Sequence, residues 1–67
     1  MNRELIETEL IGLTYEETIV YFNHIKPLYF RPIKINNSVL LKDDNIDSNR
    51  CNIIFKHNIV IVIDGWY

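Results

Sequence analysis

The chain has little of what would cross-link a small domain or anchor it in a membrane. Cys51 is the only cysteine among 67 residues, so no internal disulfide can form. Secreted domains of this size usually carry disulfide bridges. The stretch after Met1, NRELIETEL, has no apolar core of a signal peptide, and the longest apolar run, residues 59–63, is too short to span a bilayer. We therefore expect an intracellular protein.

Clusters of positive charge are also missing. The net charge is −2, and the lysines and arginines are scattered along the chain. A nucleic-acid-binding domain needs a basic stripe or patch, and an anionic membrane attracts the same feature. We therefore expect neither nucleic acid nor membrane as a partner, and a protein partner is the remaining expectation.

Groups that could carry catalysis or bind a transition metal are few. His24 and His57 do not have metal-ligand spacing with Cys51. No two titratable side chains form a pattern suited to general acid–base work. Cys51 fits better as a small apolar core residue than as a nucleophile. The sequence predicts no enzyme, no metal site and no cofactor.

One acidic stretch matches the beginning of a calcium-binding loop. Asp43, Asn45 and Asp47 occupy its first three ligand positions. The match then fails, because Ser48 stands where glycine is required and Ile54 stands where a bidentate glutamate is required. A solvated acidic loop is the better interpretation.

The clearest local pattern is a helix over residues 15–25. Thr14 and Glu17 have the spacing of a capping box, in which each side chain binds a free backbone amide of the other residue. Pro27 disfavours helical geometry at the residue before it and ends the element. An apolar stripe at helical spacing faces the core through Tyr15, Ile19, Phe22 and Ile25.

Three strands are predicted after this helix, over residues 28–35, 50–56 and 59–63. Pro32 lacks a backbone donor, so the first of them should be an edge strand or carry a bulge. The order of elements favours an α+β fold of one domain over residues 1–67. Its architecture is a single helix on a small three-stranded mixed sheet. We expect residues 1–10 to be flexible, with Leu10 available to pack.

The last two strands should form a hairpin with a two-residue turn at His57 and Asn58. This turn would pair Phe55 with Val60 and Ile53 with Val62. The face covered by the helix would then contain Cys51, Ile53, Phe55, Val60 and Val62. The opposite face would present a row of isoleucines, namely Ile54, Ile59, Ile61 and Ile63.

The first two strands are joined by a long polar stretch, which runs into the second strand within LLKDDNIDSNRCNI, residues 40–53, and has neither glycine nor proline. Two parallel neighbours need a connection of about a dozen residues, because the chain must return to the same end of the sheet. The length of the stretch therefore predicts an exposed loop between two parallel strands.

The order and spacing of these patterns over residues 11–65 resemble the potato type I family, the eglin-like serine-protease inhibitors, and its small microbial relatives. IGLTYEETIVYF resembles the family's Gly-x-Thr-x-Glu-Glu-Ala entry to its helix. DNIDSNRCNIIF resembles the end of the family's inhibitory loop and the strand after it. VIVIDG resembles the last apolar strand, which ends in glycine.

The resemblance implies that the long loop binds in a protease cleft like a substrate. The implied binding segment is residues 40–47, with Leu41, Lys42, Asp43, Asp44, Asn45, Ile46 and Asp47. Asp44 would enter the primary pocket, and the scissile bond would be Asp44–Asn45. Arg50 and Asn52 would support the loop from beneath. Alternation along the strand also places both on the face opposite Cys51.

The sequence departs from the family at the centre of the loop. The family usually offers leucine, methionine or phenylalanine where Asp44 stands, and threonine where Asp43 stands. An acidic residue suits only proteases with a basic pocket. Trp66 and Tyr67 extend beyond the family's terminal glycine.

Two functions of different classes follow. The first is reversible inhibition of a serine protease through residues 40–47. The second is a non-inhibitory interaction or structural module on the same scaffold, such as a homo-oligomer or a small subunit of a larger, for instance viral, assembly. The interface expected for such a module consists of Ile54, Ile59, Ile61, Ile63 and Trp66, since one helix covers only one face of a sheet.

Overall fold

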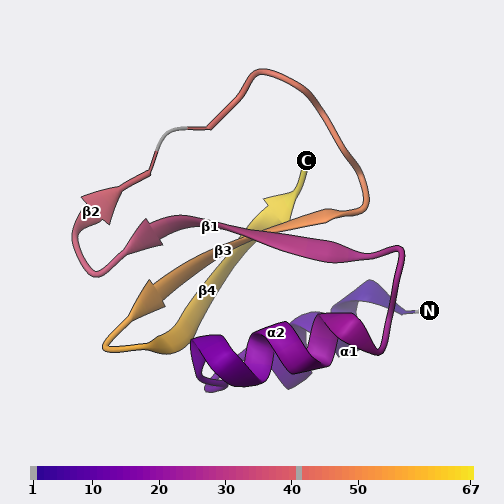
Figure 1. Cartoon of the computed structure of the whole chain (residues 1–67), viewed down its shortest axis with the longest axis horizontal. Helices are drawn as coiled ribbons and strands as arrows, with labels where there is room; N and C mark the ends of the chain where they lie inside the picture. Colours follow the sequence, from indigo (N-terminus) through magenta and orange to yellow (C-terminus); the bar gives the residue numbers. More distant parts are fainter. Residues whose placement is uncertain (1, 41) are drawn as a thin grey trace.

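The computed structural model describes residues 2–40 and 42–67 and confirms an α+β fold with a mixed sheet (Figure 1). Helices α1 (Arg3–Leu10) and α2 (Tyr15–Asn23) lie on one side of a four-stranded sheet. The strands are β1 (Tyr29–Ile35), β2 (Ser38–Val39), β3 (Arg50–Lys56) and β4 (Ile59–Trp66), in the spatial order β2-β1-β3-β4. Neither described helix is long and apolar enough to cross a membrane.

The expectation of a single helix is wrong, because residues expected to be flexible form α1. The side chain of Asn2 caps this helix by accepting hydrogen bonds from the amides of Glu4 and Leu5. Ile6 and Leu10 lie one turn apart on the same face and are fully buried. A helix of eight residues is unstable alone, so burial of this face holds it in place.

Helix α2 begins as the capping box predicts and ends slightly earlier than expected. The Thr14 hydroxyl accepts from the Glu17 amide at 3.1 Å, and the Glu17 carboxylate accepts from the Thr14 amide at 2.9 Å. The helix ends at Asn23, and His24 caps it. Between the helices, Gly12 takes a φ of +91° and donates its amide to the carbonyl of Val60 on β4.

The predicted parallel pairing of the first and second long strands is confirmed. β1 runs parallel to β3, with Arg31 opposite Asn52. A register shift after Pro32 provides the bulge expected there. The three-stranded expectation is wrong, since the chain turns at Asn36 and adds the two-residue strand β2 to the far edge of β1. Asparagine tolerates the positive φ of 55° that this turn requires.

The hairpin between β3 and β4 has the predicted two-residue turn but not the predicted register throughout. His57 and Asn58 both take positive φ, as a type I′ turn requires, and Phe55 pairs with Val60. A bulge then shifts the pairing, so that Val62 lies opposite Ile54 and Ile63 lies opposite Ile53. The predicted Ile53–Val62 pair is therefore wrong, because the bulge adds one residue to β4.

This bulge also breaks up the expected row of isoleucines. Ile63 packs against the core on the helix side, whereas Val62 is exposed. Ile61 is exposed, and Ile54 and Ile59 are half-buried. The predicted interface is thus not one continuous apolar face.

Trp66, expected as an interface anchor, packs against the core beside α1. Its indole nitrogen donates to Glu7 at 3.2 Å, and the Arg3 guanidinium carbon lies 4.4 Å from its ring centroid. The buried core itself combines both helices with β3 and β4: Ile6, Leu10, Phe22, Cys51, Ile53, Phe55 and Val60.

Helix α1 should therefore contribute strongly to stability. Replacing Ile6 with alanine should lower the free energy of unfolding by about 2–5 kcal/mol, because it leaves a cavity in the core. Leu5, its exposed neighbour on the same helix, provides the control, and Leu5→Ala should change this free energy by less than about 1 kcal/mol. Urea denaturation measures both. Equal effects of the two variants would contradict the burial of α1.

Candidate functional site

The candidate site is the connection between β2 and β3, residues 40–49, which has no helix or strand in its described part. It arches over the side of the sheet that the helices leave uncovered (Figure 1). Residues 42–46 are exposed, as predicted, and the side chain of Ile46 is 85% exposed. Leu41, one of the predicted loop residues, lies outside the described residues.

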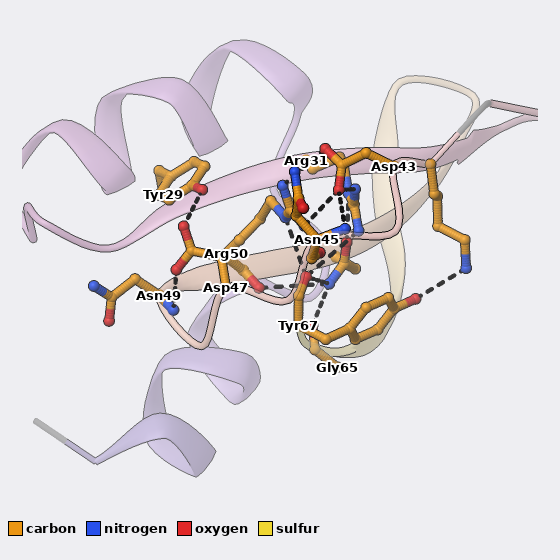
Figure 2. Close-up of polar contacts among 11 residues, drawn as sticks. Tyr29, Arg31, Asp43, Asn45, Asp47, Asn49, Arg50, Gly65 and Tyr67 are labelled. Carbon is orange, nitrogen blue, oxygen red and sulfur yellow. Dashed lines mark hydrogen bonds and ion pairs between the residues drawn. The ribbon is translucent and has the colours of Figure 1, made fainter.

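Arg50, at the start of β3, forms the main contact beneath the loop (Figure 2). Its Nη2 donates to the main-chain oxygen of Asn45 at 2.7 Å and to Oδ1 of Asp43 at 3.2 Å. Its Nη1 reaches the other carboxylate oxygen of Asp43 at 3.4 Å. The planar guanidinium is thus shared between a side chain before residue 44 and a backbone carbonyl after it.

A second arginine, Arg31 on β1, lies beside Arg50 and was missed as a site residue. Its Nη1 approaches Oδ1 of Asp43 to 3.5 Å, an ion-pair distance without hydrogen-bond geometry. Its Nε donates to Oδ1 of Asn52 at 2.7 Å. The sequence could have pointed to Arg31. Parallel pairing of the two strands places it opposite Asn52, on the predicted supporting face of β3.

Asn52 does not reach the loop in the described part of the chain. Its fully buried Nδ2 donates to the main-chain oxygens of Gly65 and Tyr67, each at 3.1 Å. Its Oδ1 accepts the hydrogen bond from Nε of Arg31. Asn52 therefore ties the end of β4 to the pair of arginines, and it supports the loop only through them.

The main-chain oxygen of Tyr67 joins these groups together (Figure 2). It accepts from Nε of Arg50 at 3.1 Å and from Nη2 of Arg31 at 3.4 Å, besides the bond from Asn52. The hydroxyl of Tyr67 contacts Asp64 and accepts from Nζ of Lys42 at 3.2 Å. Residues beyond the end of the resembling segment thus form part of the loop's support.

The far end of the loop has its own anchor at Asp47. Its carboxylate accepts hydrogen bonds from the Tyr29 hydroxyl and from the Asn49 amide, the latter at 2.9 Å. Its main-chain oxygen accepts from the Arg50 amide at 3.0 Å. The Arg3 guanidinium also donates to the main-chain oxygen of Ser48. The exposed tip at residues 44–46 is therefore held on both sides.

The two anchoring carboxylates are stabilised in their charged form. Desolvation acts to raise the pKa of Asp43, but the hydrogen bonds and charge of Arg50, the Asn45 amide and the charge of Arg31 together hold it below its ordinary value of 3.8. The pKa of Asp47 is also lowered, mainly by the hydrogen bond from the Tyr29 hydroxyl and then by the Asn49 amide. Both groups are anionic at neutral pH.

The site combines a backbone held by side-chain hydrogen bonds with exposed side chains at its tip. The described residues contain no group of three potential metal ligands close enough to hold an ion. Cys51 lies on the other face of β3, fully buried, and desolvation together with the nearby Glu7 raises the pKa of its thiol to about 12.

Acid should release the loop before it disrupts the core. Because the pKa values of Asp43 and Asp47 are lowered in the folded state, their stabilisation is complete above about 3.8 and is lost as pH falls through their lower folded values. NMR signals of residues 42–49 should therefore shift below pH 3.8. Asp43→Asn should remove part of this transition, whereas Asp44→Asn, at a carboxylate without an ion pair among the described residues, should preserve it. A loop that stays unchanged to pH 2 would contradict the anchoring.

Removing the Arg50 side chain should loosen the loop more than it destabilises the core. Arg50→Ala should speed exchange of the Asn45 amide, which is hydrogen-bonded to Asp43, by about tenfold, the equivalent of losing ~1.4 kcal/mol of charged hydrogen bonding. Lys56→Ala, at the exposed far end of the same strand, is the control. Unchanged exchange of the Asn45 amide in Arg50→Ala would refute the supporting contact.

Comparison of the chain with protein-family models, with curated proteins and with solved structures finds no match.

Proposed function

We propose that this protein is a reversible inhibitor of a serine protease and that residues 40–47 bind in the protease cleft like a substrate. Asp44 enters the primary pocket, and Asp44–Asn45 is the bond presented to the enzyme. The eglin-like assignment of the fold belongs to this proposal. It is supported by the long loop between parallel strands and by the arginine on the following strand.

The observation that carries the proposal is the contact of Arg50 on both sides of the candidate bond. Nη2 of Arg50 binds the Asp43 carboxylate on the N-terminal side of the bond and the Asn45 carbonyl on its C-terminal side. If a protease cleaved Asp44–Asn45, both new ends would remain attached to one guanidinium. Ends held together in this way favour religation and slow product release, because little entropy is gained until the loop detaches.

The anchors on either side of the tip favour the rigidity that tight binding requires. The anchors at Asp43 and Asp47 fix the backbone around Asp44, and an ordered loop loses little conformational entropy on binding. Asp44 itself is exposed, and no ion pair among the described residues holds its side chain. Its carboxylate is therefore free to enter a pocket with a basic residue at its base.

A non-inhibitory interaction module is the second candidate, and Ile46 favours it. This side chain is the most exposed large apolar one in the described chain, at 85%, and it lies between Asn45 and Asp47. Such a residue can anchor the protein on a partner surface that has no cleft to receive the loop. Ile46→Ser should weaken binding to a non-protease partner more than Asp44→Leu does, and the reverse order is expected for a protease.

Titration against a panel of serine proteases tests the inhibitor. The panel should include enzymes specific for acidic residues, chymotrypsin-like enzymes and subtilisin-like enzymes. The unmodified protein should inhibit the acidic-specific class, and Asp44→Leu should lose that inhibition by about 100-fold and gain inhibition of the other two classes, since the pocket residue sets specificity.

Glu4→Leu, at an exposed acidic position on α1, is the control and should leave the whole profile unchanged. The decisive negative result is a folded Asp44→Leu protein that inhibits no member of the panel at micromolar concentration.

A further inference from the structure

A second surface, the groove between the two helices, lies on the opposite side of the sheet from the loop. It has a volume of about 490 Å³ and is predominantly apolar. Its apolar lining is Leu5, Ile6, Leu13, Val20, Tyr21 and Ile25. Leu5 on α1 and Val20 on α2 are each 56% exposed. These two side chains border the groove from either helix, and the described chain does not cover them.

The helices around this groove carry most of the negative charge of the protein. All five glutamates fall within residues 1–23, where Arg3 is the only arginine or lysine, so this segment has a formal charge of −4 against −2 for the whole chain. Arg3 is engaged elsewhere, since it stacks on Trp66 and donates to the Ser48 carbonyl. Residues 1–23, which supply most of the lining of the groove, are therefore strongly acidic.

Two of these glutamates line the groove itself. Glu9 accepts a hydrogen bond from the Tyr21 hydroxyl at 2.7 Å, and Glu17 caps α2 at the Thr14 amide. Their positions are thus fixed by the fold. A ligand in the groove would meet an apolar floor with these two carboxylates and the imidazole of His24 beside it.

We propose that this groove binds an amphipathic helical segment of a partner protein, with apolar residues against Leu5 and Val20 and with lysine or arginine on its flanks. Helix-in-groove recognition uses such apolar anchors at helical spacing. Helices of eight and nine residues are about 12–14 Å long, so the partner would engage over two to three turns. A second copy of this chain is disfavoured, because it would bring two acidic helical layers together.

The probe is a synthetic 18-residue peptide of leucine and lysine patterned as an amphipathic helix, titrated into the full chain and followed by methyl and amide NMR. The expected result is perturbation centred on Leu5, Val20 and Ile25, with an affinity that falls as salt is raised. The same peptide with glutamate in place of lysine should not bind.

Neighbouring positions on α2 provide a matched pair of variants. Val20→Ser should weaken peptide binding by about tenfold. Ile19→Ser, at a residue that is 43% exposed and lines a different surface depression, should leave binding unchanged. Both positions are exposed, so both variants should remain folded. Asp44→Leu should also bind normally, which separates this surface from the inhibitory loop.

Several results would overturn the proposal. These are no binding at millimolar peptide, equal loss in Val20→Ser and Ile19→Ser, equal binding of the glutamate peptide, or perturbations centred on the acidic loop at residues 43–47. Concentration-dependent dimerisation that Val20→Ser abolishes, seen by sedimentation, would assign the groove to a second copy of the chain instead.

Discussion

The guanidinium of Arg50 is the group on which the structure of the loop side of the sheet depends. It is buried at the start of β3, and a buried cation is stable only if its donors are satisfied. The Asp43 carboxylate, the Asn45 carbonyl and the main-chain oxygen of Tyr67 meet that need. The loop, β3 and the end of β4 are therefore held by one group, and movement of the loop or of the end of β4 would leave some of its donors unpaired.

Alternation of side chains along β1 and β3 gives the sheet two different faces. On one face the two helices bury Ile53 and Phe55 in an apolar core. On the other face Arg31 and Asn52 stand side by side under the loop. Nearly all of β3 is buried, because each face has its own cover. The division also separates the charges, with the glutamates on the helical side and most of the aspartates in the loop.

The parts of this architecture that depend on residues close in sequence could be predicted from the sequence. The capping box of Thr14 and Glu17, the bounds of β3 and the turn at His57 and Asn58 each depend on residues close in sequence. The loop length was enough to predict parallel strands, since only a long connection returns the chain to the same end of the sheet. Alternation along one strand placed Arg50 on the face opposite Cys51, and only the resemblance to the inhibitor family placed it beneath the loop.

Tertiary contacts decided the rest. Helix α1 is too short to persist alone, and burial of Ile6 and Leu10 against distant strands stabilises it. The bulge that moves Val62 outwards follows from how β4 packs, which alternation along a single strand does not specify. Arg31 lies 21 positions before Asn52 in the sequence, and only the fold brings the two side chains into hydrogen-bond contact. The sequence by itself determined the caps, the turn and the face of each β3 residue, because these are set by neighbours along the chain. Which distant groups meet at Arg50 was determined only by the packing of the whole chain.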